Sequence, residues 1–187
     1  MSLTRVGVLA GAFNPVTRAH LALAEAASKA VDEVVYVVPR VYPHKHFHGA
    51  GLEQRVEMLR LAGAKHRVQV TEGGLFIDIA RELRRADNEI SFICGRDAAE
   101  RIIHWDYGEA GAIEKMLDEF SLLVAERDGK YEAPEHLRHR VHPIALNADF
   151  KDVSSTEVRR RIAAREPWEH LVPESIVDHV RRIYAAA

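Results

Sequence analysis

Short apolar runs and stretches of helical periodicity alternate along this chain. The apolar runs are rich in β-branched residues and predict six strands: residues 6–10, 34–38, 67–71, 90–94, 120–125 and 141–146. Between them, apolar residues recur three and four positions apart and predict helices: 21–30, 52–63, 75–83, 110–117, 155–166 and 174–184, with an interrupted helical pattern from residue 96. Strands that alternate with helices are typical of an open, mostly parallel sheet with helices on both faces.

The location of the chemistry follows from this α/β fold class. In open parallel sheets, ligands bind outside the carboxyl ends of the strands. We therefore expect functional residues in the loops after the first, second and fourth strands, and in the segment before the helix at 155–166. The sixth strand contains Pro143, which lacks a main-chain donor, and this favours a place at the edge of the sheet.

Composition and charge limit the class of protein. The chain has 187 residues, of which 47% are apolar and 29% charged, and its net charge is −2. These values predict a single domain over residues 1–187, with the helices from about residue 154 packing on the same sheet. The charge balance disfavours a protein that binds nucleic acid non-specifically. The polar outer helices show no apolar seam, so the pattern leaves open whether the chain forms a homo-oligomer.

The cysteine content and the apolar runs bear on the compartment. Cys94 is the only cysteine, so no internal disulfide can form, which suits a reducing cytosol. The amino terminus lacks the basic and apolar pattern of a signal peptide, and no apolar run approaches the ~20 residues that a membrane helix needs. We expect a cytoplasmic protein without a membrane partner, in which Cys94 is a small buried apolar residue.

The segment from Gly11 to His20 joins the first strand to the first helix. Gly11 permits a close approach of the backbone, and Asn14-Pro15 marks a turn. Thr17 is a good helix N-cap, which places His20 at the third helical position. Free N–H groups and the positive end of the helix dipole favour an anion there, so the segment predicts a phosphate site. A histidine that is only hydrogen-bonded locally is the structural alternative.

A second helix start of the same character lies near the end of the chain. Ser154 as N-cap and Glu157 three residues later form a capping box. Ser155 and Thr156 then lie in the first turn, and Arg159 lies one turn further along. A well-capped surface helix would show the same pattern, but together with the early segment it favours a second anion-binding helix start.

These two segments resemble the nucleotidylyltransferase superfamily, which combines an early (His/Thr)-x-x-His signature with a late Ser-Ser-Thr-x-x-Arg motif. Within it, the chain is most similar to the nicotinate/nicotinamide mononucleotide adenylyltransferase family, over nearly its whole length. Further short motifs occur in the family's order: Pro43-His44-Lys45, Glu53 to Leu59, Phe92 to Asp97, Trp105 and Leu171-Val172-Pro173. The resemblance implies a Rossmann-like α/β fold.

The resemblance also implies a reaction. In the family, the phosphate of a pyridine mononucleotide attacks the α-phosphate of ATP, which gives a dinucleotide and pyrophosphate in NAD biosynthesis. The implied partners are small nucleotides, and the implied cofactor is Mg²⁺, bound through the ATP phosphates and not by protein side chains. Such a transfer asks the protein mainly for positioning and charge neutralisation. The implied catalytic residues are His20, Lys45 and Arg159.

Binding residues carry over from the same motifs. On the ATP side they are Gly11, Phe13, Asn14, Thr17, Gly95, Asp97, Ser154, Ser155 and Thr156. On the acceptor side they are Trp105, Arg55 and His44. Two structural alternatives stay open: Asp97 could cap the next helix, and Trp105 could pack in the core and not stack on a pyridine ring.

Three alternating histidines, His44, His46 and His48, would share a face of an extended segment. Three histidines on one face could bind zinc. No fourth partner or supporting residue is evident, so we favour Lys45 in this loop as a phosphate contact over a metal site.

The chain departs from the family pattern at two places. Thr17 stands where most bacterial members carry His, and its hydroxyl can donate to a phosphate oxygen but carries no charge. The segment Glu72 to Asp78 lacks the Ser-Tyr-Thr-type run with which nicotinate-preferring members frame the pyridine acid. The acceptor therefore stays open between nicotinate and nicotinamide mononucleotide. The alternatives are phosphopantetheine as acceptor, CTP as donor, or a non-catalytic nucleotide-binding protein, which the retained His20, Lys45 and Arg159 disfavour.

Overall fold

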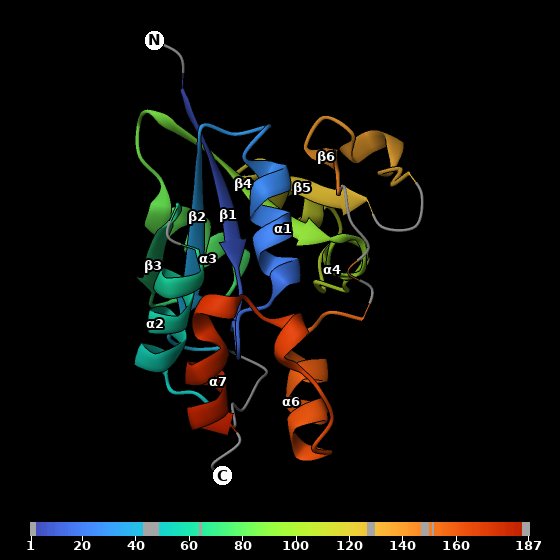
Figure 1. Cartoon of the computed structure of the whole chain (residues 1–187). Helices are drawn as coiled ribbons and strands as arrows, with labels where there is room; N and C mark the ends of the chain where they lie inside the picture. The colour runs from blue at the N-terminus through green and yellow to red at the C-terminus, as the bar shows by residue number, and fades with distance from the viewer. Residues whose placement is uncertain are drawn as a thin grey trace.

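The computed structural model describes residues 3–42, 49–63, 65–126, 130–146, 150 and 152–184. Within these residues, six strands form a sheet in the order β3-β2-β1-β4-β5-β6 (Figure 1). The strands are β1 (Thr4–Ala10), β2 (Glu33–Pro39), β3 (Arg67–Thr71), β4 (Asn88–Gly95), β5 (Ser121–Glu126) and β6 (Val141–Ala145). Every pairing is parallel, and β6, which contains Pro143, lies at an edge. The predicted sheet is confirmed.

Helices connect the strands and follow the last one. They are α1 (Arg18–Ala27), α2 (Leu52–Ala62), α3 (Phe76–Leu83), α4 (Arg96–Ile103), α5 (Ala112–Leu117), α6 (Ser155–Ala163) and α7 (Val177–Tyr184). Three short 3₁₀ turns are η1 (Glu135–Leu137), η2 (Glu169–Leu171) and η3 (Glu174–Ile176).

Some helix boundaries differ from the periodic pattern. The helix α1 ends at Ala27, three residues earlier than predicted, because the Ser28 hydroxyl donates to the carbonyl of Glu25 at 2.8 Å and competes with the continuing helix. The last predicted helix is divided into η3 and α7. The helix α6 stops at Ala163, since Arg165 adopts a left-handed conformation with φ 56°.

Each face of the sheet has its own apolar core. Successive residues of β2 point to opposite faces: Tyr36 and Val38 pack with α1, α2, α6 and α7, whereas Val35 and Val37 pack with α3, α4 and α5. This burial on both sides explains why the strand is apolar at every position instead of alternating.

The carboxyl-terminal segment shares the core of the amino-terminal helices. Val158 of α6 and Val180 of α7 lie in the same buried cluster as Ala24 of α1. The Arg18 guanidinium adds a hydrogen bond from α1 to the carbonyl of Val172, with an Nε–O distance of 3.1 Å. In Figure 1, α6 and α7 (orange and red) lie at the end of the sheet toward which the β1 arrow points. They therefore stand beside the carboxyl ends of the strands.

The direction in which the chain adds successive strands to the sheet reverses between β1 and β4. From β1 the chain winds outward through β2 to β3, and from β4 it winds the other way through β5 to β6. The carboxyl ends of β1 and β4 are adjacent, with Gly11 following the first and Gly95 ending the second. A crevice for a ligand is expected at such a switch point.

None of the helices formed by the described residues is both long enough and apolar enough to span a membrane.

Phe92 of β4 tests the α3–α5 side of the core. Its ring stacks on Phe76 at 4.1 Å between centroids and meets Phe120 edge-on at 4.9 Å, and the side chain is fully buried. We expect Phe92→Ala to lower the free energy of unfolding by ~3–5 kcal/mol, as typical for a truncated core phenylalanine. Leu75→Ala, at a half-exposed position, is the control. Equal effects of the two substitutions in urea denaturation would contradict this packing.

Candidate functional site

The turn from β1 into α1 brings Thr17 and His20 together. Thr17 is the N-cap of α1, with extended backbone angles, as predicted. Its main-chain N–H donates to His20 Nδ1 at 3.0 Å, and its hydroxyl oxygen lies 2.8 Å from the same atom. The Thr17 side chain is fully buried. The hydroxyl predicted to contact phosphate is therefore placed against the histidine, because the three-residue spacing of the helix start puts the imidazole over it.

These contacts determine which ring nitrogen of His20 carries the proton. Since Nδ1 accepts from the main-chain N–H of Thr17, a neutral ring carries its proton on Nε2. Burial lowers the pKa of His20 to about 4, because the charged imidazolium loses its hydration there. At neutral pH the ligand-free protein thus presents a neutral Nε2–H donor, with the other nitrogen held by Thr17.

Phe13 supports the ring of His20 from the core. Its main chain is left-handed, with φ 48°, and its ring is 2% exposed. The ring meets His20 edge-on at 5.0 Å and Tyr36 at 5.7 Å. A Cβ on Gly11 would lie 3.3 Å from this ring, so the glycine makes room for it. The ring of Phe13 is therefore used in packing, and its predicted nucleotide-binding role stays a prediction.

The amino end of α6 docks on the same loop. The Ser155 hydroxyl donates to the carbonyl of Pro15 at 2.7 Å, and the Arg159 guanidinium donates to the carbonyl of Asn14. Ser154 caps the helix by accepting from Glu157 N–H at 3.1 Å, which confirms the predicted cap. The starts of α1 and α6 therefore lie at one loop, as the pairing of the two motifs predicts.

Thr156 lies at the exposed surface of this helix start. Its hydroxyl accepts a long hydrogen bond from the guanidinium of Arg159 at 3.4 Å. Thr156 in the first turn of α6 and Arg159 one turn further along thus lie beside the helix start, where an anion would approach the free N–H groups.

The carboxyl end of β4 contributes a third helix start. Gly95 is the N-cap of α4, and a Cβ built on it would meet no other atom within 4 Å. The space beside this glycine is therefore open at the switch point. Asp97 is exposed in the first turn of α4, so the alternative that it caps the helix is wrong.

The predicted acceptor-side residues have very different surroundings. Trp105 follows α4 and is 62% exposed, so its alternative role in core packing is wrong. Arg55 of α2 is 4% exposed; its Nη1 donates to the carbonyl of Ala12 at 2.9 Å, and its guanidinium lies 5.9 Å from the ring of Tyr42. Arg55 thus contacts the β1–α1 loop, and its role in acceptor binding stays a prediction.

His44 and Lys45, together with the histidines at 46 and 48, lie outside the described residues. Their predicted roles in acceptor and phosphate binding, and the zinc alternative, are therefore not addressed by this structure.

Sequence reasoning missed two tyrosines that hold the site. The Tyr42 hydroxyl donates to the carbonyl of Gly11 at 2.6 Å, and the Tyr184 hydroxyl donates to Asn14 Oδ1. Neither stands in a recognised motif, and Tyr184 was only part of an amphipathic helix in the sequence. Their partners are distant in the chain, so periodicity could not reveal them.

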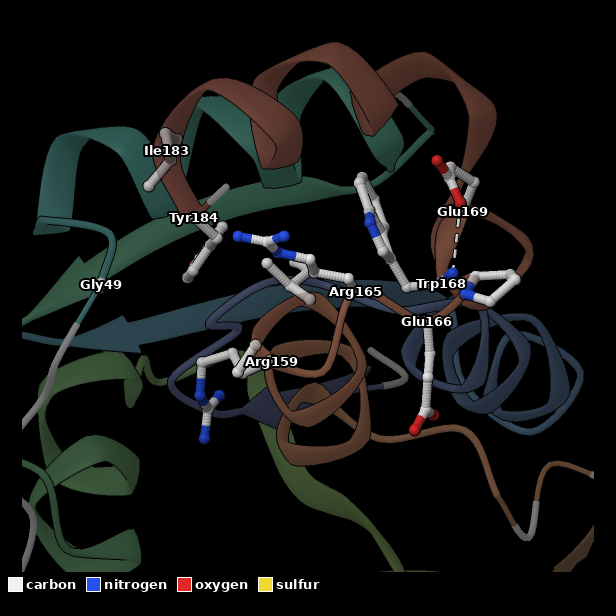
Figure 2. A pocket seen from close by; sticks show the side chains of 11 residues that line it. Gly49, Arg159, Arg165, Glu166, Trp168, Glu169, Ile183 and Tyr184 are labelled. Atoms are coloured by element: carbon white, nitrogen blue, oxygen red, sulfur yellow. Dashed lines mark hydrogen bonds between the residues drawn. The ribbon is translucent and has the colours of Figure 1, made fainter. Parts of the chain in front are cut away.

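A cavity of about 840 Å³ opens between α6 and α7, next to this loop. Arg159, Arg165, Trp168, Tyr184 and Gly49 are among its lining residues (Figure 2). In Figure 2, Tyr184 points from α7 toward the side of α6 that carries Arg159. The cavity is continuous with the Arg159 face of the site and is large enough for a nucleotide-sized ligand.

Known proteins match most of this chain. A family model described as cytidylyltransferase-like matches residues 8–161. A probable nicotinate-nucleotide adenylyltransferase of Moorella thermoacetica is 30% identical over an alignment that covers 95% of this chain and 89% of the relative. The protein of the same description from Thermus thermophilus is 31% identical, with 95% of this chain and 97% of the relative covered.

Solved structures share the fold. The nicotinic acid mononucleotide adenylyltransferase of Plasmodium falciparum, complexed with NaAD, superposes with a TM-score of 0.75 at 18% identity. The match covers 96% of this chain and 95% of that structure.

The state of His20 can be measured directly. We expect the imidazole to stay neutral, with its proton on Nε2, from pH 7.5 down to about pH 5, because burial lowers its pKa to about 4. Nitrogen-15 imidazole spectra through a pH titration report both the tautomer and the midpoint, and the His20→Gln variant identifies the signal. A midpoint near the ordinary value of about 6.5, or a proton on Nδ1, would contradict the geometry.

Proposed function

This chain belongs to the nicotinate-nucleotide adenylyltransferase family of cytidylyltransferase-like proteins, and from this premise we propose that it transfers the adenylyl group of ATP to the phosphate of nicotinate mononucleotide. The products are the dinucleotide and pyrophosphate, in NAD biosynthesis. The observation that carries the proposal is the docking of α6 on the β1–α1 loop, which places two helix starts, His20 and Arg159 around one loop.

Two helix starts at one loop suit a triphosphate. Each start presents free N–H groups and the positive end of a helix dipole, which stabilise phosphate oxygens. The Arg159 guanidinium adds a permanent positive charge, and Gly95 leaves open space at the switch point for a ligand to approach main-chain atoms. The ATP phosphates would lie between the starts of α1 and α6.

The reaction would proceed by in-line displacement at the α-phosphorus. An oxygen of the mononucleotide phosphate forms the new P–O bond, and the bond to the bridging oxygen of pyrophosphate breaks. Negative charge grows on the leaving pyrophosphate. The Nε2–H of His20 would donate to the oxygens on which this charge develops, and Arg159 would neutralise them. No covalent intermediate with the protein is needed, and Lys45 would assist from the loop before α2.

Mg²⁺ is proposed to arrive with ATP. Among the residues that the structure describes, no three or more His, Cys, Asp or Glu side chains come together as metal ligands. Mg²⁺ usually keeps water and phosphate oxygens as ligands and takes few from the protein, so the ion would be carried on the triphosphate, whose charge it would neutralise.

The acceptor would bind on the side of Trp105. Its ring is largely exposed and could stack on the pyridine ring of the mononucleotide. The named relatives favour nicotinate over nicotinamide mononucleotide as the acceptor.

A panel of substrates tests the function. We expect pyrophosphate release with ATP and nicotinate mononucleotide at the highest kcat/KM, compared with nicotinamide mononucleotide, phosphopantetheine, or CTP in place of ATP. Turnover confined to phosphopantetheine or to CTP would replace the proposed substrates. Binding of ATP without turnover of any pair would identify a non-catalytic nucleotide-binding protein.

His20 is the residue on which turnover depends most. We expect His20→Ala to lower kcat by ~10²-fold or more, the scale on which loss of one transition-state donor acts. His142→Ala, at an exposed position of the edge strand β6, is the matched control. Near-normal turnover of His20→Ala, with an unchanged melting temperature for both variants, would remove His20 from the mechanism.

A further inference from the structure

The last helix reaches the centre of the site through one side chain. Tyr184, the final residue of α7, donates its hydroxyl hydrogen to Asn14 Oδ1. Asn14 lies in the β1–α1 loop, 170 positions earlier in the chain, and is 4% exposed. A partly buried hydrogen bond therefore joins the last helix to the loop on which α6 docks.

Asn14 is the point at which three segments meet. Its side-chain Oδ1 accepts from Tyr184 and also from the N–H of Ala50 at 3.3 Å, at the end of the β2–α2 connection. Its main-chain carbonyl accepts from the guanidinium of Arg159 on α6. Asn14 therefore connects Tyr184 of α7, Arg159 of α6 and the segment that precedes α2.

The ring of Tyr184 is held close to this junction by a glycine. Gly49 has φ +106°, and a Cβ on it would lie 2.7 Å from the ring atom Cε1 of Tyr184. That distance is shorter than any contact a real Cβ makes, so only glycine lets the ring approach the 49–51 segment closely enough for the hydroxyl to reach Asn14.

From these contacts we infer that Tyr184 is a positioning residue for the nucleotide site. Its hydroxyl fixes the Asn14 side chain, and Asn14 in turn sets the place of Arg159 and of residues 49–51 relative to the loop. The inference rests on the proposed function only in its choice of ATP as the ligand of Arg159. Tyr184 itself touches no reacting atom in this arrangement.

The protonation state of Tyr184 suits this role. Burial raises its pKa to about 12, so the hydroxyl stays a hydrogen-bond donor over the whole pH range in which an assay is practical. The positively charged Arg159 and Arg55 lie near enough to oppose part of that shift. The hydroxyl thus stands among the same cationic groups that surround the loop.

The test removes only the hydroxyl. We expect Tyr184→Phe to raise the KM for ATP and the calorimetric Kd for ATP by about fivefold, the scale of one net hydrogen bond, with kcat within about twofold of the wild type. Uniform loss of ground-state and transition-state binding raises KM in this way. The control is Tyr131→Phe, which removes a buried hydroxyl that has no hydrogen-bond partner among the described residues.

A double-mutant cycle separates positioning from general stability. In an Arg159→Ala background, Tyr184→Phe should have a clearly smaller effect on ATP affinity, because the cationic residue that it positions is absent. Gly49→Ala should reproduce the Tyr184→Phe phenotype by displacing the ring, and the two changes together should have no additional effect.

Equal parameters for Tyr184→Phe and Tyr131→Phe would overturn the inference. An undiminished effect of Tyr184→Phe in the Arg159→Ala background would also overturn it. Failure of the proposed function would give a different result, because the wild type would then release no pyrophosphate with any substrate pair. In that event the calorimetric ATP affinities of the same variants still decide the role of Tyr184.

Discussion

Two main-chain carbonyl groups, those of Asn14 and Pro15, hold the start of α6 against the β1–α1 loop. Both lie in a turn where no strand or helix supplies donors, and both residues are buried. Buried acceptors without a partner cost free energy, so the Ser155 hydroxyl and the Arg159 guanidinium satisfy a need that folding itself creates. The partners of the Pro15 bond are 140 positions apart. The contacts that dock α6 on this loop therefore also bring the starts of α1 and α6 together.

The two basic groups at this loop differ in kind. Burial keeps His20 neutral in the ligand-free protein, whereas Arg159 carries a permanent charge and remains partly accessible. A charged group binds ATP phosphates in the ground state as well as in the transition state, and so it contributes mainly to affinity. A neutral donor gains most when negative charge develops on the atom that it faces. In the proposed mechanism, the burial that makes an imidazolium costly would thus suit His20 to the step in which charge moves to pyrophosphate.

Sequence patterns predicted the parallel sheet and the helix caps at Thr17 and Ser154, because each of these features depends on residues that are close together in the chain. The residues that sequence reasoning placed differently from the structure all depend on distant partners. Phe13 and Arg55 belong to motifs, yet one fills the core and the other braces a carbonyl of the loop, and only the tertiary packing decides this. Tyr184 had no signal at all, since its partner is 170 positions away and a tyrosine in an amphipathic helix has many ordinary uses.

The proposed ATP side and the proposed mononucleotide side of the site consist of different structural elements. This difference explains why the sequence identifies the ATP side more firmly than the mononucleotide side. The donor side consists of helix starts and main-chain groups that are cross-linked by hydrogen bonds, and such geometry tolerates few sequences. The proposed acceptor side includes Trp105, which is exposed on the connection after α4, and exposed connections generally vary more in sequence than the elements that they join. Between β3 and α3, a Cβ on Gly73 would lie 2.5 Å from Cβ of Asp78, so that turn requires glycine for its own packing. A bulky side chain therefore has no room at Gly73, so no pyridine-framing residue can stand at this position.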